Sequence, residues 1–168
     1  MVRHSLAGAM SVVLGLLAAC SPGGGATASA QAPVAAAAAA ARHPVSGLEV
    51  IDLVVERGAT RLAFKVELAD TPEAQARGLM FRTELGDFEG MIFPSAVPEP
   101  RSFWMKNTPL SLDIIFIGAD GRILNIAANT VPYSTASVSS KGNASAVLEL
   151  RAGRAAALGI VPGDRVTY

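Results

Sequence analysis

The chain has 168 residues, of which 51% are hydrophobic and 17% are charged, and its 14 basic residues balance its 14 acidic ones. Without Arg3, which belongs to the leading segment described next, 13 basic residues face 14 acidic ones, a formal charge of −1. A nucleic-acid partner is therefore not expected, because binding to phosphates requires a basic excess.

The N-terminus has the pattern of a bacterial lipoprotein export signal. Arg3 and His4 precede a mostly apolar stretch, residues 6–19, which is too short to span a bilayer comfortably. Small residues stand directly before Cys20, as in a lipobox. We expect residues 1–19 to be a signal peptide and Cys20 to carry the lipid that anchors the mature chain in the membrane. The alternative is an ordinary secretory signal with an incidental cysteine.

Residues 20–45 are expected to be the lipidated cysteine and a flexible tether, because Gly, Ala, Ser, Pro and Gln dominate there and offer little to pack. Ser21, rather than an aspartate, follows Cys20, which favours the outer membrane with the domain facing the periplasm. Residues 46–168 are then long enough for a single globular domain with one core. Cys20 is the only cysteine, so that core has no internal disulfide.

The expected domain contains neither histidine nor cysteine, since His4 lies in the signal and His43 in the tether. This excludes a Ser-His-Asp or Cys-His nucleophile, a zinc site of the usual kind and a thiol redox site. The only glycine cluster, residues 23–25, lacks the strand and helix that a phosphate-binding loop requires. We therefore expect no cofactor.

In chain order, the first predicted elements are two strands, over residues 48–55 and 60–68, with a turn at residues 57–59. Their alternation of apolar and polar residues indicates a β-hairpin with one solvent-exposed face. A short helix is predicted next. It begins at residues 70–73, where a capping side chain, a proline and an acid follow one another, and it ends at Gly78.

The second half of the chain is predicted to consist mainly of strands, over residues 90–94, 103–107, 112–118, 123–127, 146–150 and 165–168. Asp120-Gly121 is the strongest hairpin turn, and a second short helix covers residues 152–158. Residues 130–145 are polar and irregular, and would form either a lid or a surface loop. The fold class is mainly β, an antiparallel sandwich or half-open barrel of about eight short strands with two short helices.

The run over residues 103–117, FWMKNTPLSLDIIFI, combines a dense polar set with an almost fully apolar strand. If residues 103–107 and 112–117 form a hairpin, Lys106 faces Asp113 and Trp104 faces Ile115 on one side of the sheet. That arrangement predicts a partly buried ion pair beside an indole. It would either fasten the hairpin or orient a ligand, and a slip of one residue in register would remove it.

Several motifs occur in a distinctive order along residues 50–168: Arg77-Gly78-Leu79-Met80, Gly90-Met91-Ile92-Phe93, Trp104-Met105-Lys106-Asn107-Thr108, Leu112-Asp113-Ile114-Ile115-Phe116 and Leu148-Glu149-Leu150. This order and spacing resembles domain-of-unknown-function family 192. The resemblance implies a small β-rich domain that is often exported. It implies no established activity and no catalytic residues that could be carried over.

The candidate ligand-binding residues follow from this run and from the charged residues near the other motifs. In the hairpin, Trp104 would form the floor of a pocket, with Lys106, Asn107 and Asp113 at its mouth. Glu149 points to the sheet face opposite Leu148 and Leu150, and Arg77 and Arg82 are candidate partners for it. The candidates are Trp104, Lys106, Asn107, Asp113, Glu149 and Arg82.

Two further chemistries remain as alternatives. Asp113 and Glu149 could act as a carboxylate pair in acid–base or glycosidase catalysis. Met80, Met91 and Met105 could bind Cu(I) in an oxidising envelope, although methionine more often fills gaps in a core.

The leading functional hypothesis is a lipid-anchored domain of the bacterial envelope that binds a small molecule, a glycan or a protein segment without chemistry of its own. One rival is an enzyme that uses paired carboxylates on a carbohydrate or envelope polymer. The other is a structural or assembly lipoprotein.

Overall fold

The computed structural model describes residues 41–168. The predicted signal peptide, Cys20 and residues 21–40 of the predicted tether lie outside the described residues. Within the described part, neither helix is long and apolar enough to cross a membrane.

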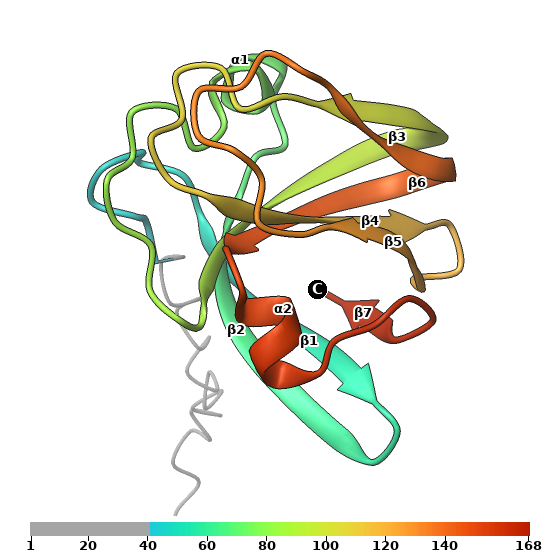
Figure 1. Ribbon diagram of the computed structural model, residues 1–168. Coiled ribbons are helices and arrows are strands. Elements are labelled where there is room, and N and C mark those ends of the chain that lie inside the picture. The colour runs from blue at the N-terminus through green and yellow to red at the C-terminus, as the bar shows by residue number, and fades with distance from the viewer. Residues whose placement is uncertain (1–40) are drawn as a thin grey trace, which may run out of the picture. The chain divides into compact units, whose positions relative to one another are not determined.

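Seven strands form one sheet in the order β5-β4-β6-β3-β2-β1-β7 (Figure 1). All neighbouring strands are antiparallel except β2 and β3, which are parallel. Two short helices accompany the sheet. The elements are β1 (Val50–Arg57), β2 (Thr60–Leu68), α1 (Pro72–Arg77), β3 (Glu89–Phe103), β4 (Leu112–Gly118), β5 (Ile123–Ala127), β6 (Val138–Arg151), α2 (Arg154–Leu158) and β7 (Arg165–Thr167).

The sheet curls until its two edge strands approach each other, which makes it a half-open barrel. Arg122, just before β5, forms an isolated bridge with Arg165 of β7. The backbone N–H of Val166 also donates to the carbonyl of Gly121 at 2.7 Å. One buried cluster, the inner core, takes residues from every strand and from the α2 region. Its members are Leu53, Val55, Phe64, Val66, Ile92, Ile115, Ile117, Ile123, Ala146, Leu148, Leu150, Ala155, Ile160 and Val166.

The opposite face of the sheet carries a second buried cluster, the outer core. Loops and the region of α1 cover this face, and β3 and β6 extend beyond the barrel as a two-stranded ribbon beside them (Figure 1). Prolines and shifts in register interrupt this ribbon, as expected where a strand lies outside a central sheet. The outer core consists of Ala69, Leu79, Leu85, Met91, Phe93, Met105, Leu112, Ile114, Phe116, Ala144 and Val147.

The predicted first helix is confirmed, and its boundaries follow from local chemistry. The Thr71 side chain accepts a hydrogen bond from the backbone N–H of Ala74, and Pro72 occupies the first turn. The helix ends at Gly78, whose φ of +48° favours a residue without a Cβ. This stop turns the chain toward the outer core, where Leu79 is buried.

The mainly β fold class is confirmed, but the hairpin predicted at residues 103–117 is wrong. β4 pairs with β5 and β6, and residues 104–107 form no strand. Instead, the N–H of Thr108 donates to the carbonyl of Met105 at 3.1 Å, and Asn107 adopts a φ of +56°. This tight turn places residues 104–108 over the sheet, because the chain cannot continue extended through a left-handed residue.

Candidate functional site

The segment that contains Trp104 forms one side of a pocket of about 360 Å³, here called the Trp104 pocket. The end of α1 forms the opposite side, and the sheet forms the floor. The volume falls within the range of about 300–1,000 Å³ that is typical of small-molecule sites. The pocket is lined by Gln75, Ala76, Arg77, Gly78, Leu79, Met80, Phe93, Arg101, Ser102, Phe103, Trp104, Lys106, Thr108 and Glu149.

Trp104 and Lys106 stand together at the mouth of this pocket. The indole is 47% exposed although it is the largest apolar side chain of the domain. The ammonium of Lys106 lies 5.0 Å from the centre of the indole ring, a cation–π contact. Lys106 therefore contacts Trp104 directly and does not pair with Asp113 as the sequence predicted. Both side chains remain available to a ligand.

Asn107 and Thr108 shape the pocket by holding its wall in place. The carbonyl of Asn107 accepts a hydrogen bond from the N–H of Phe81 at 2.8 Å, which ties the turn to the segment after α1. Its side-chain amide donates to the sulfur of Met80 at 3.7 Å. Thr108 is buried and its hydroxyl donates to the carbonyl of Lys106 at 3.2 Å. Thr108 lines the pocket, whereas Asn107 does not.

Three cations surround the pocket. Arg77 and Lys106 make no ion pair within residues 41–168. Arg101 is held more firmly, since its guanidinium donates to Gln75 Oε1 at 3.2 Å and lies 5.6 Å from the centre of the Phe103 ring. It also lies 4.0 Å from a carboxylate oxygen of Glu99, at the limit of an ion pair.

Among residues 41–168, Glu149 is the only acidic residue that lines the pocket. It lies on β6 opposite Met91 of β3 and Ile114 of β4, so it projects to the outer-core face, as the alternation with Leu148 and Leu150 predicted. Only 4% of it is exposed. Burial raises the pKa of this carboxyl from 4.5 to about 8. At neutral pH Glu149 is therefore a protonated, uncharged hydrogen-bond donor.

Asp113 does not belong to the pocket. It pairs in register with Leu150 on the inner-core face, whereas Glu149 pairs with Ile114 on the opposite face. Its two carboxylate oxygens accept the backbone N–H groups of Asn129 and Ala155, each at 2.9 Å. Ala155 lies in the first turn of α2, so Asp113 caps the N-terminal end of that helix. The predicted pair of carboxylates cannot act on one substrate from opposite faces of a sheet.

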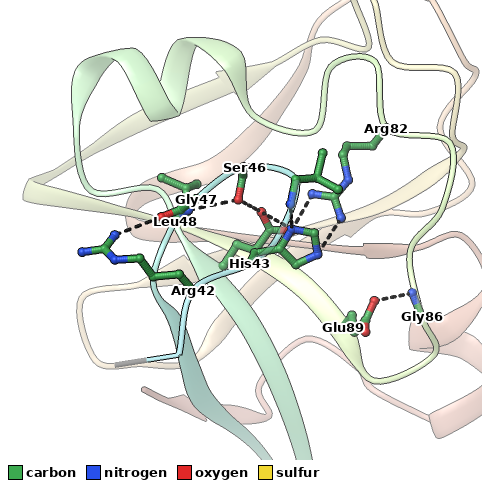
Figure 2. A network of polar contacts seen from close by, with 10 residues as sticks. Arg42, His43, Ser46, Gly47, Leu48, Arg82, Gly86 and Glu89 are labelled. Carbon is green, nitrogen blue, oxygen red and sulfur yellow. Dashed lines mark hydrogen bonds and ion pairs between the residues drawn. The ribbon is translucent and has the colours of Figure 1, made fainter. Parts of the chain in front are cut away.

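Arg82 also lies away from the pocket, in a polar network at the start of the described chain (Figure 2). Its guanidinium donates to the buried carboxylate of Glu67 at 2.6 Å and to His43 Nε2 at 3.1 Å. Ser46 donates to the second oxygen of that carboxylate. Figure 2 shows His43 and Arg82 facing each other. His43, which the sequence analysis assigned to the tether, thus packs on the domain, so the domain does contain a histidine.

The three methionines proposed for Cu(I) do not share one cavity. Met91 and Met105 are buried in the outer core, and only Met80 lines the Trp104 pocket. The sulfur of Met105 accepts a hydrogen bond from the Thr130 hydroxyl at 3.1 Å. Within residues 41–168, no group of three or more His, Cys, Asp or Glu side chains is arranged to hold a metal ion.

Sequence reasoning identified Trp104, Lys106 and Glu149, and it named Arg77 as a candidate partner of Glu149, but it missed Arg101. Arg77 belongs to the motif that ends α1, and its place in the last turn of a short helix was a usable signal. Arg101 had no such signal, because it reaches the pocket only through the ribbon of β3 and β6.

The comparisons with known proteins agree with the fold. The model of the family DUF192, described as an uncharacterized ACR, matches residues 53–168. A protein of unknown function from Novosphingobium aromaticivorans DSM 12444 has 54% identity and a TM-score of 0.75, over 79% of this chain and 94% of that chain. A candidate transcription regulator from Sinorhizobium meliloti 1021 has 37% identity and a TM-score of 0.69, over 71% of this chain and 94% of that chain.

No curated protein matches the chain. The match to the family model extends over β2 to β7 and includes every residue that lines the Trp104 pocket. The chain therefore belongs to domain-of-unknown-function family 192.

Proposed function

We propose that this protein is an envelope lipoprotein whose domain binds a small organic anion in the Trp104 pocket. The observation that carries the proposal is the charge of the pocket. Arg77, Arg101 and Lys106 line it, and its single acid, Glu149, is uncharged at neutral pH because burial raises its pKa to about 8. The pocket thus has a net positive charge that a bound anion would balance.

The protonated carboxyl of Glu149 favours a carboxylate ligand in particular. Glu149 lines the pocket, so its carboxyl can meet a ligand that enters there. A carboxylate oxygen would accept the Glu149 proton in a short, charge-assisted hydrogen bond while the cations balance its charge. Phe93, Phe103 and Trp104 would contact the apolar part of the same ligand.

The cellular setting of the proposal comes from the N-terminus. A lipid on Cys20 would anchor the chain in the outer membrane, with the domain in the periplasm and the pocket open to exported or imported small molecules. The formal charge of −1 for the mature chain argues against nucleic acid as a partner. The description of the Sinorhizobium meliloti relative as a candidate regulator is therefore not carried over to this chain.

Fluorescence of Trp104 tests the proposal, because it is the only tryptophan and lines the pocket. Benzoate should change the emission in a saturable way, whereas benzyl alcohol, which lacks the charge, should not. Lys106→Gln should weaken benzoate binding about fivefold, as expected for the loss of roughly 1 kcal/mol from one cation at the rim.

The matched control is Lys141→Gln, which removes an exposed lysine outside the pocket and should leave the affinity unchanged. If benzoate and benzyl alcohol give the same response, the pocket does not select anions and a structural or assembly role becomes the better explanation.

An enzymatic role is the second candidate, favoured by the raised pKa of Glu149. A carboxyl that is protonated at neutral pH is a competent general acid. However, no other acidic side chain lines the pocket, so a glycosidase with two carboxylates would need a second acid from elsewhere. Binding without chemistry requires no such addition, and we therefore favour it.

A further inference from the structure

A second, smaller pocket of about 260 Å³ adjoins the first and is here called the Val131 pocket. Phe103 and Trp104 line both pockets, so the two cavities flank the same pair of aromatic side chains. The remaining walls come from the end of β5, the following loop and the start of β6. The apolar members of these walls are Ala127, Ala128, Val131, Ala136 and Val138, and Met105 from the segment between β3 and β4 joins them.

Phe103 and Trp104 form the wall between the two pockets. Phe103 packs against other aromatic rings, whereas Trp104 is accessible to solvent. The Phe103 ring makes edge contacts with Phe93 and Phe116, at centroid distances of 5.1 and 6.2 Å. Trp104 is 47% exposed and continues this wall toward solvent. A ligand that occupied both pockets would pass Trp104 at this accessible rim.

The loop that lines the Val131 pocket is held against β4 by hydrogen bonds. Thr130 is buried, and its hydroxyl donates to the carbonyl of Leu112 on β4 at 2.9 Å. The Ser111 hydroxyl donates to the carbonyl of Thr130 at 2.7 Å. These bonds fasten the loop to β4 and leave the next residue, Val131, 69% exposed beside the cavity.

The chemical difference between the two pockets indicates what spans them. In the part of the chain that the structure describes, three cations and one acid line the Trp104 pocket, whereas no charged residue lines the Val131 pocket. The Val131 pocket is also smaller than the roughly 300 Å³ at which complete small-molecule sites begin. It is thus suited to part of a ligand whose charged end is held elsewhere.

We propose that the ligand is an aliphatic carboxylate, with its charged head in the Trp104 pocket and its hydrocarbon chain across Trp104 in the Val131 pocket. The inference rests on the proposed anion binding and adds the class of ligand. Apolar residues, five of them alanine or valine, make up most of the lining of the second pocket, and these match a saturated chain better than a polar or a charged one.

A series of carboxylates of increasing length tests the inference by Trp104 fluorescence. Acetate, butyrate, hexanoate and octanoate carry the same head and differ only in chain length. Each methylene that leaves water should raise the affinity about fourfold until the Val131 pocket is full. Equal affinity for all four acids would overturn the inference, while benzoate binding would show that the anion site itself still stands.

Val131→Asp supplies the matched perturbation, because Val131 and Val97 are both 69% exposed and only Val131 lines the pocket. In Val131→Asp the affinity for octanoate should fall at least tenfold and approach that for acetate. Val97→Asp should keep the chain-length dependence. If both variants behave alike, the chain does not occupy the Val131 pocket and the inference fails.

Trp104 and Val131 could instead contact a lipid surface. Binding to lipid vesicles distinguishes membrane contact from binding of a free carboxylate. Phosphatidylglycerol vesicles should not shift the Trp104 emission when free octanoate does, and octanoate should compete with benzoate. Emission that responds to vesicles but not to free octanoate would overturn the inference in favour of membrane contact.

Discussion

Replacement of Glu149 by glutamine should stabilise the protein at neutral pH and leave it unchanged in acid. Glu149 is 4% exposed, and burial raises the pKa of its carboxyl from 4.5 to about 8. The folded protein therefore keeps this proton at pH values where the unfolded chain has already released it. Because unfolding then releases a proton, the free energy of unfolding falls as the pH rises from about 4.5 to 8.

The size of the effect on stability follows from the rise in the pKa of Glu149 on folding. One pKa unit corresponds to about 1.4 kcal/mol, so the stability linked to Glu149 falls by about 3 kcal/mol between pH 4 and pH 7. Above pH 8 the loss reaches a plateau of about 5 kcal/mol. Glu149→Gln retains the shape and polarity of the protonated acid but cannot ionise. At pH 7 it should therefore be more stable than the wild type by about 3 kcal/mol.

Urea denaturation followed by circular dichroism measures this difference at pH 4, 6, 7 and 8. The midpoints for wild type and Glu149→Gln should coincide at pH 4 and separate progressively above it, with unchanged slopes. The matched control is Glu84→Gln, which alters an exposed acid that forms no ion pair within residues 41–168. The wild type and this control should respond to pH in the same way.

Two results would refute the reasoning about Glu149. One is a constant gap between the two midpoints from pH 4 to pH 8, which would mean that the substitution changes packing and not ionisation. The other is a Glu149→Gln variant that is less stable than wild type at pH 7, which would mean that the carboxyl is ionised and stabilised in the folded protein.

Further predictions concern the pocket and the two residues that the structure moves out of it. Benzoate affinity should fall as the pH rises through about 8, because ionised Glu149 repels the ligand, and a titration of Glu149→Gln over the same range should show no such fall. Asp113→Ala should lower the free energy of unfolding by about 2–4 kcal/mol, since it leaves two backbone donors unpaired, and denaturation at pH 7 measures this. The same variant should bind benzoate with wild-type affinity, and a selective loss of binding would contradict the assignment of Asp113 to α2. Arg82→Met should cost about 3 kcal/mol by removing the arginine that balances the buried Glu67 carboxylate, and adding Glu67→Gln should recover part of the loss in a double-mutant cycle.

Elements set by neighbouring residues were predictable from the sequence alone. The limits of β2, β4 and β5 coincide with the predicted strands, because alternation and turn residues depend on short-range sequence. The start and end of α1 follow from Thr71, Pro72 and Gly78 in the same way. The face of Glu149 was also predictable, since a strand places alternate residues on opposite sides.

The pairing of strands was decided only by the tertiary structure. Residues 103–117 have the pattern of a hairpin, yet β4 pairs with β6, which begins 20 residues after β4 ends. This pairing buries all of β4 between two strands, which a local hairpin with residues 103–107 would not achieve. Because residues 104–108 do not pair with β4, they turn at Asn107 and cover the outer core. β3 and β6 also extend beyond the apolar segments that the sequence predicted as strands. These extensions pair with each other, so neither could be recognised from its own sequence.

The sequence by itself determined that this chain is a mainly β domain of family 192 and identified Trp104, Lys106 and Glu149 as candidate ligand-binding residues. The tertiary structure decided which of the candidates meet. It placed Asp113 and Glu149 on opposite faces of the sheet, and it brought Arg77 and Arg101, not Arg82, to the pocket that Glu149 lines. The reason is physical: a motif fixes the chemistry of a side chain, but burial and charge at a site depend on elements that are distant in the chain.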